Sequence, residues 1–174
     1  LNAYENVHSP RLVDFLTTAW DRWEALGEEG QDPMCNLPLT GEKEEINQHV
    51  TLPLIPGNIP LSRDPYQRPS KNVMGQVGFF CTDTCTPIFA QLQDELLWDC
   101  AVVQQAVESL KNESPSIVYA LANHPGHHAA HDSFGGYCYL NHAAFAARLL
   151  QKDHSKVAIL DVDYVSDPPH SDVH

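Results

Sequence analysis

The stretch that decides the fold reads ANHPGHHAAHDSFGGYCYLN over residues 122–141, then a short helical pattern, then KVAILDVDY over residues 156–164. It places two adjacent histidines after one apolar segment and ends the next apolar segment in two acids spaced one residue apart. Apolar runs of this kind are typical of buried parallel strands, whose carboxyl ends carry the binding site of an α/β sheet. The stretch therefore predicts an α/β fold with a site at that edge.

Strands are expected over residues 116–121 and 157–163, and a short one over GQVGFF at 75–80. Together with the intervening helix, the first two predict a right-handed βαβ unit. Helices are predicted from apolar residues at helical spacing and from their start and stop signals. They cover residues 10–27, 87–111 and 141–151. Residues 28–75 are rich in Pro, Asn, Gly and charge, which predicts a long irregular segment that lines a site or is an excursion.

Composition limits the classes of function. A formal net charge of −13 argues against direct nucleic-acid binding and suits a cationic substrate or partner, or serves solubility alone. No apolar run is long enough to span a membrane, and no secretory signal is visible. Five cysteines without a regular framework indicate reduced thiols and a cytoplasmic or nuclear location. The spacing of Cys81 and Cys85 permits a metal pair, but packed or loop thiols are favoured because no matching second pair follows.

His127 and His128 are candidates for proton transfer. Adjacent loop histidines can each take a carboxylate partner, which fixes the tautomer and raises the basicity of the ring. One ring then accepts a proton from water while the other supplies one to a leaving amine. The alternative is a pair of loop histidines without a role, which the glycine-punctuated loop around them disfavours.

Asp161 and Asp163 lie on the same face of the expected strand. Two acids there are costly unless they bind a cation or pair with histidine, so a metal-assisted hydrolase site is predicted. The alternative is a strand end that reaches solvent. Behind the histidines, the Gly136 carbonyl can accept a hydrogen bond from an amide substrate, and Tyr137 can form an apolar wall. Cys138 activated by His127 would make a thiol enzyme, a third and weaker hypothesis.

The run PGHHAAHDSFGGYCYLNHAAFAARLL with KVAILDVDY resembles the zinc-dependent histone deacetylase superfamily, and within it the acetylpolyamine amidohydrolase branch. Weaker likeness through GQVGFFCTDTCTPI and FLTTAWDRWEALG extends it over most of residues 7–164. The resemblance implies an arginase-like three-layer α/β/α sandwich with a parallel sheet. It also implies an amide hydrolase that acts on acetyl-lysine or acetylpolyamine.

By this resemblance, His127 and His128 match the tandem catalytic histidines, of which at least one is a general base. Asp161 matches the carboxylate that hydrogen-bonds the first of them, beside a structural monovalent-cation site. Asp163 matches the first zinc ligand. Gly136 and Tyr137 match the acyl channel, where the family usually has Gly-Phe.

The chain also departs from the family pattern. Val165 stands where the family has its second zinc ligand, and nothing matches the third ligand or the catalytic tyrosine. His170 and His174 are the substitute ligands that the tail offers. Asn123-His124 replaces the usual Arg-Pro, and Met74 lies near a position where polyamine enzymes carry an acid, so the substrate of the branch stays open.

We therefore expect residues 1–164 to be the N-terminal part of a deacetylase domain, incomplete at both ends, and residues 165–174 to be an atypical tail. Zinc belongs to the intact family, and the chain alone is expected to be inactive. The alternative is a non-catalytic product or interaction module. An exposed strand edge in such a part of a sheet would also favour a homodimer.

Overall fold

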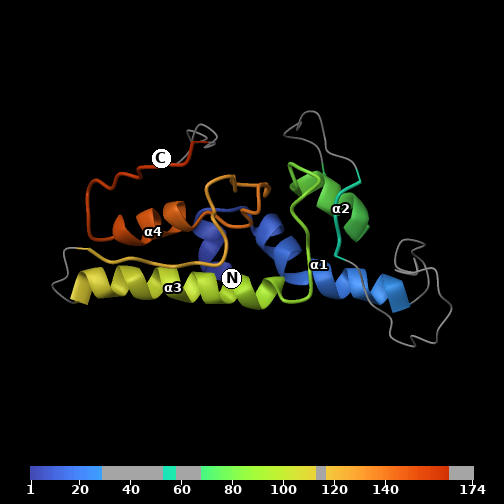
Figure 1. The fold of residues 1–174 in the computed structure, drawn as a ribbon, viewed down its shortest axis with the longest axis horizontal. Helices are drawn as coiled ribbons and strands as arrows, with labels where there is room; N and C mark the ends of the chain where they lie inside the picture. The colour runs from blue at the N-terminus through green and yellow to red at the C-terminus, as the bar shows by residue number, and fades with distance from the viewer. Residues whose placement is uncertain (29–52, 58–67, 113–116, 165–174) are drawn as a thin grey trace.

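The computed structural model describes residues 1–28, 53–57, 68–112 and 117–164 (Figure 1). Helices form most of the regular structure in these ranges. In chain order they are the 3-10 helix η1 (Asn2–Asn6), α1 (Pro10–Glu28), α2 (Val73–Phe80), α3 (Leu92–Asn112) and α4 (His142–Leu150). Most of the predicted irregular segment 28–75 lies outside the described residues, and so does the tail 165–174.

The predicted helices over 10–27 and 141–151 are confirmed as α1 and α4. In α1, Leu12, Leu16, Ala19 and Trp23 recur at helical spacing and are all buried. In α4, the Asn141 side chain caps the helix by accepting the Ala144 N–H at 2.9 Å.

The helix predicted over 87–111 begins later, at Leu92. Residues 87–91 are not part of the helix, and Ile88 instead pairs with Leu54 through two backbone hydrogen bonds of 2.8 Å.

The strand predicted over 75–80 is wrong, because this segment belongs to α2. Val73, Val77 and Phe80 are 1–2% exposed and recur at helical spacing, so their burial requires a helix. The Asn72 side chain starts the helix by accepting the Met74 N–H. Residues 73–75, which the sequence predicted as the end of the irregular segment, therefore belong to α2.

The core lies where α1 packs on α2 and where α3 packs on α4. Phe15 of α1 lies 5.0 Å from Phe80 of α2 and 6.1 Å from Phe134 of the loop before α4, measured between ring centroids. Tyr4 of η1 lies 4.1 Å from Phe145 of α4. These aromatic contacts join the helices to one another, and the contact between Phe15 and Phe134 holds the loop between residues 122 and 141 against α1.

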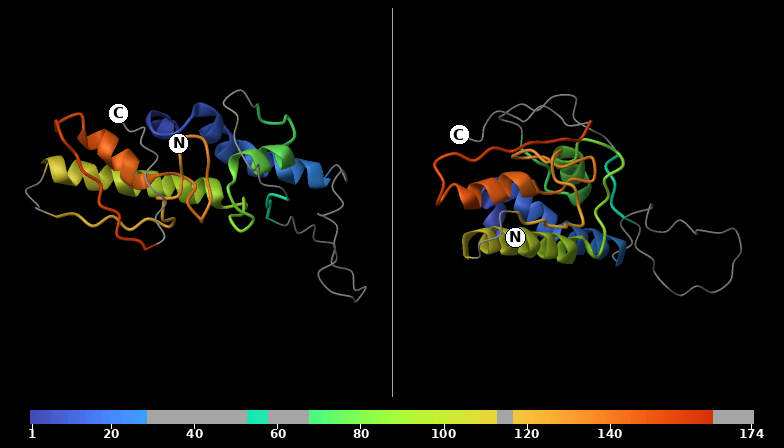
Figure 2. Two further views of the ribbon diagram at one scale, coloured as in Figure 1. Left: turned by 90° about the horizontal axis from the view of Figure 1, so that it is seen from above. Right: turned by 60° about the vertical axis from the view of Figure 1, so that its left-hand side comes forward.

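The two principal predicted strands do not form a sheet within the described residues, where only isolated bridges occur. Residues 117–121 and 157–163 are extended, and Ile117 and Leu160 are 84% and 87% exposed. In Figure 1 residues 117–121 run along α3 and residues 157–163 run above α4; Figure 2 gives two further views. Without neighbouring backbones to pair with, their apolar sequence is not enough to make strands. The predicted βαβ unit is therefore not formed in the described part of the chain.

Candidate functional site

The loop that carries His127 and His128 is anchored at Gly126. Its N–H donates to the Cys138 sulfur at 3.0 Å. Gly126 has φ +111°, and a Cβ at this position would lie 2.9 Å from the Leu140 carbonyl oxygen. Only glycine fits this conformation and this close approach, so the loop is held firmly against the start of α4.

The structure brings His127 and Asp161 together although their strands do not pair. Nδ1 of His127 lies 3.0 Å from Oδ2 of Asp161, and the side chains are 21% and 34% exposed. Oδ1 of Asp161 accepts the Asp163 N–H at 3.0 Å. This N–H, together with the His127 ring, lowers the pKa of Asp161 from its ordinary value. The carboxylate is therefore charged at neutral pH and orients the imidazole.

His128 lies beside this pair. The rings of His127 and His128 meet edge to face with centroids 4.2 Å apart. Gly136 packs on the His128 ring, since a Cβ on Gly136 would lie 2.5 Å from His128 Cδ2. Gly136, the predicted channel residue, thus packs against His128, which in turn contacts His127.

Two residues that the sequence analysis did not single out shape the channel loop. Asp83 Oδ2 accepts the Gly136 N–H at 2.5 Å, and Thr86 Oγ1 accepts the Tyr137 N–H at 3.0 Å. Burial would raise the pKa of Asp83, but backbone N–H groups, including that of Gly136, lower it overall. Tyr137 is held at φ +60°, and the residue is 56% exposed. The signal available in the sequence was the Asp-x-x-Thr spacing, which is typical of an Asx turn.

Cys138 does not suit the thiol-enzyme hypothesis. Its sulfur is buried and accepts the Gly126 N–H. Burial raises the pKa of this thiol, so it stays protonated at neutral pH and is a poor nucleophile. Cys81 is also buried, with its thiol directed at the Asp83 carbonyl at 3.2 Å, while Cys85 is exposed.

The predicted zinc site is not assembled by the part of the chain that the structure describes. Three or more His, Cys, Asp or Glu side chains in a metal-binding arrangement are not found there. Asp163 thus does not belong to a group of three or more such side chains among these residues, and Val165, His170 and His174 lie outside them. The monovalent cation beside Asp161 stays a prediction.

The protein-family model described as the histone deacetylase domain matches residues 2–164 of the chain. The chain belongs to the histone deacetylase family. It is 35% identical to the acetylpolyamine amidohydrolase of Mycoplana ramosa over 159 residues, which are 91% of the chain and 40% of that protein. It is 34% identical to acetylpolyamine amidohydrolase 2 of Pseudomonas aeruginosa over 165 residues, 94% of the chain and 41% of that protein.

The chain therefore spans about 40% of the length of the curated relatives it matches. These matches confirm the predicted superfamily and its acetylpolyamine branch. A crystal structure of the acetylpolyamine aminohydrolase from Burkholderia pseudomallei superposes with a TM-score of 0.66 at 24% identity, over 89% of this chain and 38% of that one. This likeness supports the deacetylase fold. The sandwich with its parallel sheet is not confirmed, since the described residues contain no sheet.

Proposed function

We propose that the chain carries the proton-transfer part of an amide hydrolase site that removes acetyl groups from amines, and that it does not turn over substrate alone. The observation that carries the proposal is the 3.0 Å contact between His127 Nδ1 and Asp161 Oδ2. A carboxylate at Nδ1 holds the proton on that nitrogen and leaves Nε2 to exchange protons.

In this proposal His127 accepts a proton from the attacking water at Nε2. His128, whose ring lies beside it, donates a proton to the leaving amine. Gly136 and Tyr137 border the channel that the acetylated side chain occupies. Asp83 and Thr86 keep this border in place through the two backbone N–H groups.

Zinc, which the family implies, would polarise the acetyl carbonyl. The described residues do not supply a ligand set for it, so no step here depends on the metal. Val165, in place of the second ligand, has no donor atom. This substitution is the reason for proposing that the chain alone is inactive.

The proposed substrate is an acetylated lysine or an acetylated polyamine. The names of the relatives point to polyamines, and a net charge of −13 favours a cationic molecule. Met74, 45% exposed on α2, brings no charge that would select a polyamine over a lysine side chain. We place the protein in the cytoplasm or nucleus, where its free thiols stay reduced.

A chimera tests the proposed function. Residues 2–164 replace the matching part of the Mycoplana ramosa relative, and acetate release from acetylated polyamine and acetyl-lysine peptide is measured. We expect the chimera to be active, and His127→Ala to lower kcat by at least about 100-fold, as loss of a general base does. His154→Ala, an exposed histidine after α4, is the control. A folded chimera that hydrolyses neither substrate contradicts the proposal.

The chain itself tests the second part of the proposal. The purified chain should release no acetate from either substrate, with or without added zinc. Turnover that a chelator abolishes would show that the chain assembles a complete site, and the proposed inactivity would then be wrong.

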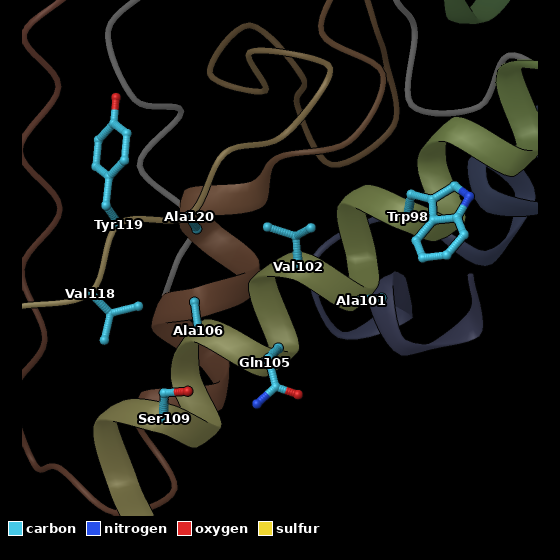
Figure 3. Close-up of a pocket in the computed structure, with 9 residues that line it drawn as sticks. All are labelled: Trp98, Ala101, Val102, Gln105, Ala106, Ser109, Val118, Tyr119 and Ala120. Atoms are coloured by element: carbon cyan, nitrogen blue, oxygen red, sulfur yellow. The ribbon is translucent and has the colours of Figure 1, made fainter. Parts of the chain in front are cut away.

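A non-catalytic interaction module is the second candidate function, because apolar surface is exposed. A groove of about 420 Å³ runs between α3 and residues 118–120, with Trp98 and Tyr119 among its lining residues (Figure 3). Trp98 is 69% exposed, and Leu160 and Val162 are both 87% exposed. Surfaces of this kind mark binding sites, and a second copy of the chain is the partner we propose.

Sedimentation of the purified chain tests this second proposal. It should show a dimer that Leu160→Lys weakens, and a monomer at high concentration would contradict the proposed dimer.

A further inference from the structure

A buried carboxylate on α3 contacts the chain just before the two site histidines. Asp99 is 1% exposed, and its Oδ1 accepts the Asn123 N–H at 2.6 Å. Its Oδ2 accepts the His124 N–H at 3.3 Å and lies 2.8 Å from Nδ1 of the same histidine. One carboxylate therefore fixes both the backbone and a ring immediately upstream of Pro125.

Other polar side chains complete this cluster. Glu95, one turn before Asp99 on α3, lies 3.3 Å from Nε2 of His124. His142, the first residue of α4, has Nε2 3.5 Å from Asp99 Oδ2 and Nδ1 2.7 Å from the Tyr4 hydroxyl. The cluster thus joins η1, α3 and α4 to the loop, and all of these residues lie outside the proposed proton-transfer pair.

Asp99 is charged in this environment. Burial would raise its pKa, but the hydrogen bonds from the His124 ring and the Asn123 N–H, together with the nearby His142 ring, hold the pKa well below its usual range. A buried carboxylate is kept only where such donors compensate for lost water, and hydrogen bonds to a charged acceptor are about twice as strong as neutral ones. The loop is therefore held by strong contacts at this point.

The contacts of Asp99 with Asn123 and His124 lie close in the chain to the proposed proton-transfer histidines. Downstream of His124, Gly126 is fixed by its N–H bond to Cys138 and by the Leu140 carbonyl, which leaves no room for a side chain. The loop is thus held at residues 123–124 and again at 126, and His127 follows directly. Little freedom remains for the chain to rotate the His127 ring away from Asp161.

We propose that Asp99 is a positioning residue for the proton-transfer histidines. It holds Asn123 and His124 so that Nδ1 of His127 meets Asp161. The importance of this position for catalysis rests on the function proposed above, but the placement of the ring can be measured without any turnover.

The test uses the full chain labelled with ¹⁵N. Ring-nitrogen chemical shifts of His127 report its tautomer and its contact with Asp161, and hydrogen exchange reports the Asn123 and His124 amides. Asp99→Asn should move the His127 ring signals and speed exchange of both amides by at least about tenfold, since each loses a bond to a charged acceptor. Leu96→Ala, on the buried face of the same helix, is the control for general destabilisation and should leave the His127 signals in place.

Where Asp99→Asn does not fold, His124→Gln replaces it, because this variant keeps Asp99 and both backbone bonds and loses only the ring contacts with Asp99 and Glu95. It should move the His127 signals in the same direction by a smaller amount. Unmoved His127 signals in a folded variant overturn the positioning role and leave the proposed function standing. An inactive chimera with the expected spectra would overturn the proposed function and leave the positioning role standing.

Discussion

Lowering the pH should destabilise the chain through one buried histidine, His8. Its residue exposure is 0%, and the atoms around it fix the tautomer. Nδ1 lies 2.7 Å from the Ala130 carbonyl oxygen, which can only accept, and Nε2 lies 2.8 Å from the Asn141 N–H, which can only donate. A proton on Nε2 would face the Asn141 N–H and break that bond, so the folded chain needs the neutral ring.

Burial is the main cause that lowers the pKa of His8, from 6.5 to about 4, and the neighbouring His131 and His142 add to it. Between these two values the unfolded chain binds a proton that the folded chain does not bind, so stability falls as the pH falls. Linkage gives a loss of about 2 kcal/mol from His8 alone between pH 7 and pH 5. Asp99 adds nothing in this window, because its pKa lies below its usual range.

Urea unfolding followed by circular dichroism at a series of pH values measures this loss. His8→Gln should be less stable than the wild type at pH 7 and should lose about 2 kcal/mol less than the wild type between pH 7 and pH 5. His154→Gln, an exposed histidine, should follow the wild-type slope. Equal slopes for His8→Gln and the wild type would refute the reasoning, because the buried ring would then titrate as it does in the unfolded chain.

Further variants test the packing and the loops, each by urea unfolding. Gly126→Ala should lower the free energy of unfolding by about 1–3 kcal/mol, because Gly126 has a positive φ and the Leu140 carbonyl lies close to it. Gly57 has open space around it, so Gly57→Ala should be within about 1 kcal/mol of the wild type. Equal losses in the two variants would contradict the close approach at Gly126. Thr86→Val should cost about 1–3 kcal/mol, because the hydroxyl loses its bond to the Asp83 carboxylate and the bond that it accepts from the Tyr137 N–H, and no loss would argue against these bonds. Phe15→Ala should cost about 3–5 kcal/mol, and a cost under about 1 kcal/mol would place Phe15 outside the core.

Local signals in the sequence predicted the helices where capping and apolar spacing agree, as in α1 and α4. They did not predict α2, because GQVGFF would be apolar on nearly every side of a helix. The helical spacing of its buried residues is visible only when Val73 is included. The strands were predicted from apolar runs, but pairing depends on which backbones lie alongside. Residues 117–121 and 157–163 form no bridge with each other in the described part of the chain.

The sequence predicted only part of the candidate site. The contact between His127 and Asp161 was implied by the family resemblance and is present, since it needs only the ends of the two segments to meet. Asp83 and Asp99 were missed because the loop N–H groups that they bind, those of Gly136 and Asn123, lie far along the chain, and local spacing does not identify such distant partners. For Asp99 a signal existed, namely an acid in the buried row with Leu92, Leu96 and Val103.

The central claim is that this chain carries the proton-transfer histidines of a deacetylase site without a complete zinc site. The most direct test is the zinc content of the purified, monodisperse and folded chain, compared with Asp163→Ala and His128→Ala. We predict far less than one zinc per chain in all three proteins. One zinc per chain that is lost in Asp163→Ala and kept in His128→Ala would contradict the claim, because Asp163 would then bind the metal together with ligands from elsewhere in the chain.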